Sequence, residues 1–163
     1  MPSVYLGIGS NIDPVENIKA AVTLLRDHFP EAPIAFSSVF TAKPRECEDQ
    51  ADFLNAVAMF ETEHEPDVLY RRLNAIEKLL RKQTPFRYGP RTIDIDLLLY
   101  SDMVLVSPTL ILPHPRMHER RFVLEPLVEL VDVNHPHPRL KKTWKELLEE
   151  VQQQEVEKTD IVL

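Results

Sequence analysis

Glycine is scarce in this sequence of 163 residues, where it occurs at positions 7, 9 and 89 alone. Because residue 12 is Ile12, Gly7 and Gly9 do not begin the G-x-G-x-x-G pattern with which dinucleotide-binding folds hold a pyrophosphate. No glycine is followed by Lys-Ser or Lys-Thr, which excludes a P-loop. A nucleotide bound to this protein is therefore held without a glycine-rich cradle.

Cysteine is also scarce, and the sequence has neither long apolar runs nor an excess of positive charge. Cys47 is the single cysteine, so neither an internal disulfide nor a cysteine-based zinc site is possible. No run approaches the ~18 apolar residues of a membrane span, and the N-terminus lacks a signal-peptide pattern. The formal net charge of −7 is opposite in sign to that of most nucleic-acid-binding domains. We therefore expect a cytoplasmic protein that binds small molecules and has no membrane or nucleic-acid partner.

The length predicts a single domain over residues 1–163. Alternating apolar residues predict strands over residues 4–8, 34–41, 53–62, 92–100, 103–106 and 110–112. Helical periodicity predicts helices over residues 14–29, 66–80, 117–124 and 144–154. Two strands follow the first helix in tandem, which argues against a doubly wound parallel sheet. The predicted fold class is α+β, a ferredoxin-like sandwich with a mainly antiparallel sheet flanked by helices.

Several local expectations accompany this assignment. Asp13 is expected to cap the first helix. The acidic tail from Glu146 onward is expected to be a solvated helix face, and His135-Pro136-His137 a surface turn. The apolar residues of the strand over 92–100 are expected on one side, namely Ile93, Ile95, Leu97 and Leu99.

Two aspartates in the segment Arg91-Thr92-Ile93-Asp94-Ile95-Asp96 carry the most chemical information. Residues two apart on a strand share a face, so Asp94 and Asp96 are expected side by side, with Cα atoms roughly 6.6 Å apart. Cations keep such a pair ionised, and hard oxygen ligands suit Mg²⁺. A solvated strand face is the alternative for the pair taken alone. The five basic and no acidic residues from Lys78 to Arg91 favour the metal site, because metal-bound polyphosphate needs further cations.

Weaker signals come from a histidine and from aromatic residues. Pro113-His114-Pro115-Arg116 places His114 in a rigid extended turn, where it could donate to a phosphate or simply face solvent. Phe53 and Asn55 share one face of a predicted strand and could bind a flat heterocycle by stacking and edge hydrogen bonds. Strand aromatics more often belong to the core, and the same alternative applies to Phe122.

Together these segments resemble the 6-hydroxymethyl-7,8-dihydropterin pyrophosphokinase family of the folate pathway. The most specific match is Gly89-Pro90-Arg91-Thr92-Ile93-Asp94-Ile95-Asp96. Supporting matches, in order along the chain, are Gly9-Ser10-Asn11, Asp49-Gln50, Phe53-Leu54-Asn55, Ile76-Glu77, Pro113-His114-Pro115-Arg116 and Arg120-x-Phe122-Val123-Leu124-x-Pro126-Leu127. The resemblance covers about residues 4 to 130.

The resemblance implies an enzyme that transfers the β,γ-diphosphate of ATP, its co-substrate, to the hydroxymethyl group of the reduced pterin and releases AMP. It implies two Mg²⁺ ions on Asp94 and Asp96, and we expect a monomer. The implied catalytic residues are Arg81, Arg91, Asp94 and Asp96. The implied pterin-binding residues are Pro44, Phe53, Asn55 and Phe122. The implied ATP-binding residues are Asn74, Glu77, Arg81, Tyr88, Arg91, His114 and Arg120.

Three positions depart from the resemblance: two segments, and Pro115, which stands where some family members have tyrosine and others proline. The family's threonine followed by Pro-x-Gly corresponds to Ala42-Lys43-Pro44-Arg45-Glu46, and its Leu-Gly-Arg-x-Arg corresponds to Leu80-Arg81-Lys82-Gln83. The sequence therefore supports the metal site more strongly than it supports pterin binding. Two alternatives stay open: a D-x-D two-metal phosphoryl or nucleotidyl transferase with another acceptor, and a non-catalytic homologue that binds a nucleotide or a pterin.

Overall fold

The computed structural model describes residues 1–42, 53–82 and 93–163. The elements in chain order are β1 (Ser3–Ser10), α1 (Pro14–His28), β2 (Ala35–Phe36), β3 (Phe40–Ala42), β4 (Phe53–Glu61), α2 (Pro66–Lys82), β5 (Asp94–Tyr100), β6 (Leu105–Val106), β7 (Ile111–Leu112), the 3₁₀ helix η1 (Met117–Glu119), α3 (Arg121–Leu127), α4 (Trp144–Glu149) and β8 (Val156–Lys158). Three predicted site residues, Pro44, Tyr88 and Arg91, lie outside the described residues. No helix within the three described ranges has both the length and the apolar character needed to cross a membrane.

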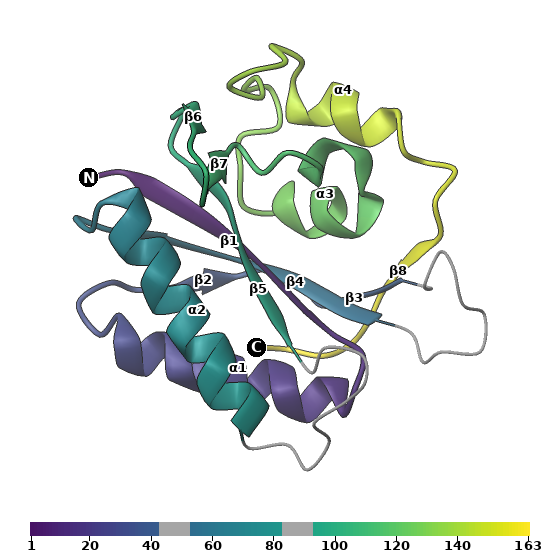
Figure 1. Cartoon of the computed structure of the whole chain (residues 1–163). Coiled ribbons are helices and arrows are strands. Elements are labelled where there is room, and N and C mark those ends of the chain that lie inside the picture. The colour runs from purple at the N-terminus through teal and green to yellow at the C-terminus, as the bar shows by residue number, and fades with distance from the viewer. Residues whose placement is uncertain (43–52, 83–92) are drawn as a thin grey trace.

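One antiparallel sheet forms the centre of the fold, with strand order β5-β1-β4-β3-β8 and with β2 also paired to β4 (Figure 1). The unit β1-α1-β3-β4-α2-β5 places β1 between β4 and β5, which is the split β-α-β arrangement of ferredoxin-like folds. β6 and β7 form a separate antiparallel pair. The predicted α+β sandwich with a flanked antiparallel sheet is confirmed.

Two apolar cores pack against opposite faces of this sheet. α1 and α2 cover one face, and the apolar stripe of α2 from Leu69 to Leu80 is buried there as its periodicity predicts. η1, α3 and α4 cover the other face, where Trp144 is the largest buried side chain. Figure 1 shows α3 and α4 grouped together, away from α1 and α2. The face on which a strand residue lies therefore decides which helices it contacts.

A β-bulge in β5 reverses, part-way along the strand, the face of the sheet to which its alternate side chains point. The register partners of Tyr5 and Leu6 in β1 are Leu99 and Leu97, so Leu98 is an extra residue in β5. Leu97 joins the core beneath α1 and α2, whereas Leu98 and Leu99 join the core beneath α3 and α4. The expectation that the apolar residues of this strand all lie on one side is wrong for Leu99, because one inserted residue shifts the alternation.

Other boundaries differ from the sequence-based expectations for local reasons. The strand predicted over residues 34–41 is divided into β2 and β3, because the Ser37 hydroxyl accepts the Val57 N–H at 2.8 Å in place of a backbone carbonyl. The helix predicted over residues 117–124 is divided into η1 and α3 at Arg120, whose backbone is extended. Asp13 precedes α1 with left-handed backbone (φ 38°) and makes no side-chain capping bond, so the expected aspartate cap is wrong.

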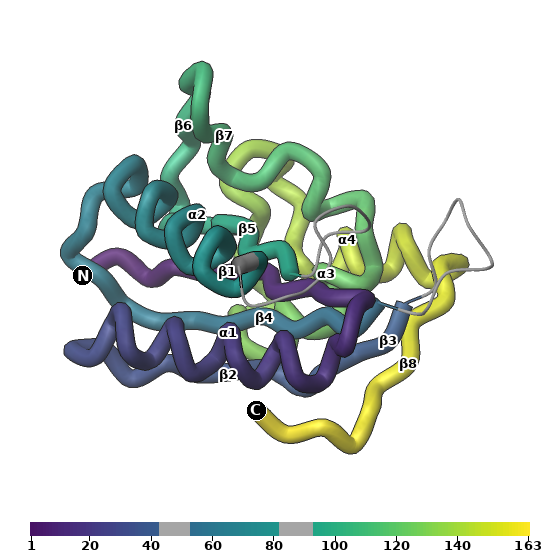
Figure 2. Tube along the Cα trace, turned by 60° about the horizontal axis from the view of Figure 1, so that its bottom comes forward, coloured from purple at the N-terminus to yellow at the C-terminus, as the bar shows by residue number. Residues whose placement is uncertain are grey.

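The segment near the C-terminus contains a short strand, β8, where a helix face was expected. α4 ends at Glu149, and β8 pairs antiparallel with β3. Figure 2 shows this yellow segment running beside β3 at the edge of the sheet. The expectation of a solvated helix face is wrong for β8, because a short edge strand takes its conformation from its pairing partner rather than from its own periodicity.

His137 is fully buried, so the expected surface turn at His135-Pro136-His137 is wrong for this residue. Its Nδ1 accepts the backbone N–H groups of Arg139 and Leu140, both at 3.1 Å. The ring packs against the rings of Trp144 and His118, with centroids 5.4 and 5.7 Å away. Burial, reinforced by the neighbouring charges of His118 and Arg139, lowers the pKa of His137 to about 4.

This burial predicts a loss of stability in acid. An unfolded histidine has a pKa near 6.5. Between about pH 6.5 and 4, the His137 imidazole is therefore protonated in the unfolded chain but not in the folded protein. Stability is complete above this window, and we expect it to fall by up to ~1.4 kcal/mol per pH unit as the pH is lowered through it. His137→Asn keeps an acceptor for the two N–H groups and should flatten the slope, measured by urea unfolding from pH 7 to pH 4.5. Equal slopes in the parent and the variant would contradict the assignment.

Candidate active site

A cavity of about 580 Å³ opens on the face of the sheet that carries α3. Its floor comes from β5, β1 and β4, and its sides come from residues 114–123 and from residues 154–156 near the C-terminus. It brings together seven of the predicted site residues, Phe53, Asn55, Asp94, Asp96, His114, Arg120 and Phe122. The fold therefore gathers these residues from distant parts of the chain at one place.

The cavity floor is built from register partners in three adjacent strands. Asp94 of β5 faces Gly9 of β1, which in turn faces Asn55 of β4. Asp96 lies in the next row of the same face, opposite Gly7. Side chains of one row project to the same face of a sheet, and glycines in the central strand leave open space between the carboxylates and the amide. The expected placement of Asp94 and Asp96 on one face is confirmed by the burial of Ile93 and Ile95, which alternate with them along the chain.

Glu77 of α2 holds the backbone between the two aspartates. β5 ends the strand order of the sheet, and the Ile95 N–H donates to the Glu77 carboxylate at 2.6 Å. Burial raises the pKa of Glu77, and the backbone hydrogen bond and the Arg81 charge oppose that rise. Glu77 therefore holds the backbone between Asp94 and Asp96 by a hydrogen bond on the side of β5 that faces away from β1.

Arg81 brings positive charge to the aspartates from the last turn of α2. Its guanidinium lies 3.5 Å from the Glu77 carboxylate and 3.8 Å from that of Asp94. The side chain is 40% exposed, so a ligand can reach it. This position suits a group that contacts a phosphate beside the carboxylates.

Asn55 places an amide with a free donor in the cavity floor. The side chain is buried, and its Nδ2 has no hydrogen-bond partner among the described residues. A Cβ atom at Gly9 would lie 2.9 Å from the Asn55 Oδ1, so only glycine leaves room for this amide. A buried donor without a partner is costly in a folded protein and commonly marks a site that a ligand completes.

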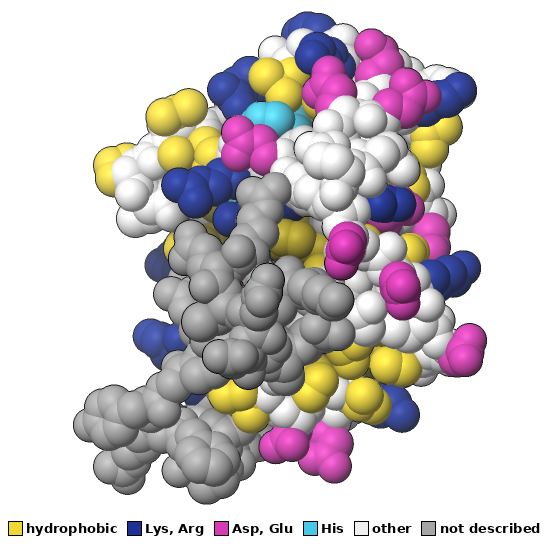
Figure 3. Space-filling view, turned by 90° about the vertical axis from the view of Figure 1, so that its right-hand side faces the viewer, with side chains coloured by type: hydrophobic (Ala, Val, Ile, Leu, Met, Phe, Trp, Pro, Cys, Tyr) yellow, Lys and Arg dark blue, Asp and Glu magenta, His cyan; other side chains and the backbone are white. Residues whose placement is uncertain are grey.

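Two half-buried aromatic rings, Phe53 from β4 and Phe122 from α3, line the same cavity. The Arg120 guanidinium lies over the Phe122 ring, 5.6 Å from its centroid. Figure 3, viewed from the right-hand side of Figure 1, shows basic, acidic, apolar and histidine side chains next to one another in its upper half. The cavity thus combines flat apolar walls with positive charge, which suits a planar heterocycle joined to an anion.

His114 borders the aspartates in a neutral state. Burial, followed by the charges of Arg120 and Arg116, lowers the pKa of His114. Its Nδ1 accepts the Arg116 N–H at 3.2 Å, so the neutral ring carries its proton on Nε2. This histidine can therefore donate one hydrogen bond without adding a charge.

A second cavity of about 250 Å³ adjoins the first and shares Asp96 and His114 with it. Its lining is completed by Tyr70, Leu97, Pro115, residues 107–110 in the turn between β6 and β7, and Ile111 of β7. The turn residues were not predicted as site residues, because a Ser-Pro turn between two short strands carries no chemical signature. The arrangement provides two compartments that meet at a carboxylate.

Three predicted ATP-binding residues, Asn74, Glu77 and Arg81, are on α2 and are not among the residues that line either cavity. Arg81 reaches the site through Asp94, 3.8 Å away. Glu77 acts on β5 from the edge of the sheet, as described above. The predicted contacts of Asn74 and Glu77 with ATP stay predictions.

Comparison with known proteins now assigns the chain to a family. Residues 5–132 match the family described as 7,8-dihydro-6-hydroxymethylpterin-pyrophosphokinase. The 2-amino-4-hydroxy-6-hydroxymethyldihydropteridine pyrophosphokinase of Aquifex aeolicus is 37% identical over 147 residues, which cover 90% of each chain. The Bacillus subtilis protein of the same name is 40% identical over 127 residues, covering 77% of this chain and 76% of its own. The chain therefore belongs to the 6-hydroxymethyl-7,8-dihydropterin pyrophosphokinase family.

Solved structures support the same fold at lower identity. The HPPK-DHPS protein of Plasmodium falciparum superimposes with a TM-score of 0.65 at 15% identity, over 92% of this chain and 43% of that one. An HPPK-DHPS in complex with substrates gives a TM-score of 0.70 at 11% identity, over 93% and 43%. This chain thus spans less than half the length of these structural neighbours.

The edge contact of Glu77 generates a prediction about stability. Glu77→Ala leaves the Ile95 N–H without its acceptor, so we expect the free energy of unfolding to fall by ~1–3 kcal/mol. Glu77→Gln keeps an acceptor oxygen and should lose less. Urea unfolding at pH 7 measures both, with Glu149→Ala, at an exposed helical glutamate, as the control. Equal losses in Glu77→Ala and Glu149→Ala would contradict the role of Glu77.

Proposed function

We propose that this chain transfers a diphosphate group from ATP to the hydroxymethyl group of 6-hydroxymethyl-7,8-dihydropterin and releases AMP, as a step of folate biosynthesis. Membership of the family and the names of its relatives support this activity. The structural observation that carries it is one juxtaposition: the Asn55 Nδ2, which has no hydrogen-bond partner among the described residues, lies in a cavity with two aromatic rings, in the same strand row as Asp94.

The larger cavity is the acceptor site. A pterin is flat and has both donors and acceptors along one edge, so a carboxamide can pair with that edge while the rings of Phe53 and Phe122 contact its faces. The Asn55 Nδ2 would then gain the acceptor that the described residues do not provide. Asp94, one strand beyond Gly9 in the same row, is placed for the hydroxymethyl end of the ligand.

The smaller cavity is the donor site. Its apolar lining from Tyr70, Leu97 and Ile111 suits an adenine ring, and it opens toward Asp96 and His114, which both cavities share. ATP bound there would extend its phosphates to the junction, where the His114 Nε2–H and the Arg120 guanidinium can donate to them.

The residues at the junction fit Mg²⁺. Asp94 and Asp96 offer hard oxygen ligands on one accessible face, and no group of three or more His, Cys, Asp or Glu in the described ranges could hold a metal by itself. Mg²⁺ usually completes its coordination with substrate phosphate oxygens and water. When bound, such ions neutralise phosphate charge and orient the reacting groups. We propose that Asp94 and Asp96 hold two of them.

The reaction needs positioning more than proton transfer. The hydroxymethyl oxygen loses its proton to solvent water and forms a bond to the β-phosphorus of ATP, and the bond from that phosphorus to the oxygen bridging to the α-phosphorus breaks, so that AMP leaves. This chain's contribution is to hold both substrates in line, to shield them between aromatic walls and to surround the phosphates with Arg81, Arg120 and His114. The monomeric state, the cytoplasmic location and the single domain over residues 1–163 stay predictions.

Removal of either carboxylate tests the metal site. We expect Asp94→Asn and Asp96→Asn to lower Mg²⁺-dependent AMP formation by at least ~100-fold, because each removes a ligand charge while keeping the size of the side chain. Chromatographic detection of AMP measures this, and Asp67→Asn, at an exposed aspartate of α2, is the matched control. Variants within threefold of the parent would rule out the assignment of the metal site to these two carboxylates, whereas a parent that forms no AMP would favour the non-catalytic homologue.

The Asn55 amide tests the identity of the acceptor. Asn55→Ala should weaken pterin binding by ~1–3 kcal/mol while ATP affinity stays unchanged, because the loss falls on a buried hydrogen bond to one ligand. Gly9→Ala should act in the same direction, since its methyl group displaces the amide oxygen. Calorimetry with a non-hydrolysable ATP analogue present measures the pterin affinity, with the exposed Asn134→Ala as control. Unchanged pterin affinity in Asn55→Ala would favour a D-x-D transferase with another acceptor.

A further inference from the structure

The larger cavity has a wall that lies outside the family-matching residues 5–132. We call residues 152–158 the C-terminal strap. Gln154, Glu155 and Val156 of this strap line the larger cavity together with Phe53, Asn55 and Phe122 of the predicted pterin site. None of the residues described as lining the smaller cavity comes from the strap. The strap therefore borders the acceptor compartment and not the donor compartment.

One end of the strap is fastened to the sheet beside the acceptor site. Val156 of β8 is the register partner of Ala42 in β3, and Ala42 is in turn the partner of Phe53 in β4. Beyond β8, the Thr159 N–H and hydroxyl donate to the Val39 carbonyl at 2.9 and 2.8 Å. A single row thus runs from the strap to the aromatic wall, so a shift of the strap is transmitted to Phe53 through β3.

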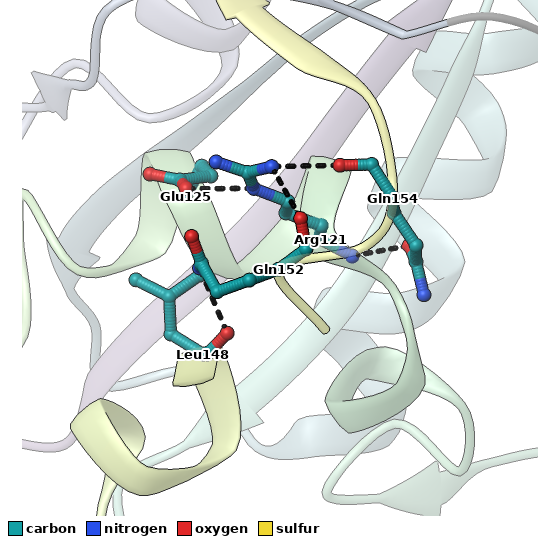
Figure 4. Close-up of polar contacts among 5 residues, drawn as sticks. All are labelled: Arg121, Glu125, Leu148, Gln152 and Gln154. Carbon is teal, nitrogen blue, oxygen red and sulfur yellow. Dashed lines mark hydrogen bonds and ion pairs between the residues drawn. The ribbon is translucent and has the colours of Figure 1, made fainter. Parts of the chain in front are cut away.

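The other end is fastened by Arg121, the first residue of α3 (Figure 4). Its Nη1 donates to the carbonyls of Gln152 and Gln154 at 3.1 and 2.7 Å, and its backbone N–H donates to the Gln154 Oε1 at 2.9 Å. The Gln154 side-chain amide also donates to the Glu119 carbonyl at 2.7 Å, just before α3. Glu125 orients the guanidinium through a 2.9 Å contact with its Nε. One arginine therefore joins four groups at a half-buried position, where charge-assisted hydrogen bonds are strong.

The position of Arg121 in the chain links this clamp to the second aromatic wall. Its neighbours Arg120 and Phe122 both line the larger cavity, while the Arg121 side chain is occupied by the strap and by Glu125. The clamp thus ties the start of α3, which carries Phe122, to the strap, which is paired through β3 to Phe53. The separation of the two rings depends on both connections.

We propose that the C-terminal strap is a wall of the acceptor compartment and that Arg121 is a positioning residue, which sets the width of the pterin site through Gln152 and Gln154. The inference rests on the proposed function and adds a role for a segment outside the family-matching range. It assigns Arg121 to acceptor recognition and not to ATP binding or to chemistry.

Steady-state kinetics of Arg121→Met test this assignment. Methionine keeps an apolar stem but cannot donate, so we expect the KM for the pterin to rise by about tenfold while kcat and the KM for ATP stay within about twofold. Arg121→Lys retains one donor for the strap carbonyls and should recover part of the loss. Arg71→Met is the matched control, because Arg71 is also a helical arginine paired with an acid four residues away, and it is 73% exposed. It should leave all three constants unchanged.

A second variant keeps the test decisive if Arg121→Met folds poorly. Gln154→Ala removes the side-chain hydrogen bonds of the strap to the Arg121 N–H and the Glu119 carbonyl but keeps the strap carbonyls, and it should raise the pterin KM in the same way. In the double variant the two effects should not add, since both loosen the same attachment of the strap to the start of α3. An unchanged pterin KM, an equal rise in the KM for ATP, or simple additivity would overturn the inference. Failure of the unmodified protein to form AMP with this pterin would instead overturn the proposed function, and with it the acceptor assignment.

Discussion

The register that sets β4 and β5 on either side of β1 is the constraint on which the site depends. It places Asp94, Gly9 and Asn55 in one row, with Asp96 in the next row of the same face. Slippage of one residue in either pairing would turn the carboxylates or the amide toward the core beneath α1 and α2. Burial of Ile93 and Ile95 between α2 and the sheet resists that slip, and Glu77 holds the Ile95 N–H from the outer edge. The hydrophobic alternation that stabilises the strand therefore also directs the two carboxylates toward the cavity.

The site retains features that a purely structural sheet would not keep. Gly9 lies mid-sheet, where glycine weakens a strand, and the structure shows its use: any side chain there would collide with the Asn55 amide. Asn55 in turn leaves a buried donor without a partner among the described residues. Both features lower the stability of the free protein, and a planar ligand with an acceptor at its edge would offset the second.

The distribution of charge explains how an acidic protein can bind an anionic co-substrate. The formal net charge is −7, yet Arg81, Arg116 and Arg120 lie on or beside the cavities that contain the two aspartates. Arg81 lies 3.8 Å from the Asp94 carboxylate. Burial, followed by the charges of Arg120 and Arg116, lowers the pKa of His114, which keeps this ring neutral and able to donate. Local arrangement, rather than net charge, sets the electrostatics of the site.

Features that depend on short-range periodicity could be predicted from the sequence. The buried stripe of α2, the shared face of Asp94 and Asp96 and the ferredoxin-like order of elements each follow from spacing within a few turns or strands, whereas the family is predicted from the resemblance of its motifs. The bulge at Leu98, the burial of His137, the pairing of β8 with β3 and the second cavity were visible only in the folded structure. These depend on contacts between residues far apart in the chain, and local patterns carry no information about which partner a short strand or a turn will meet.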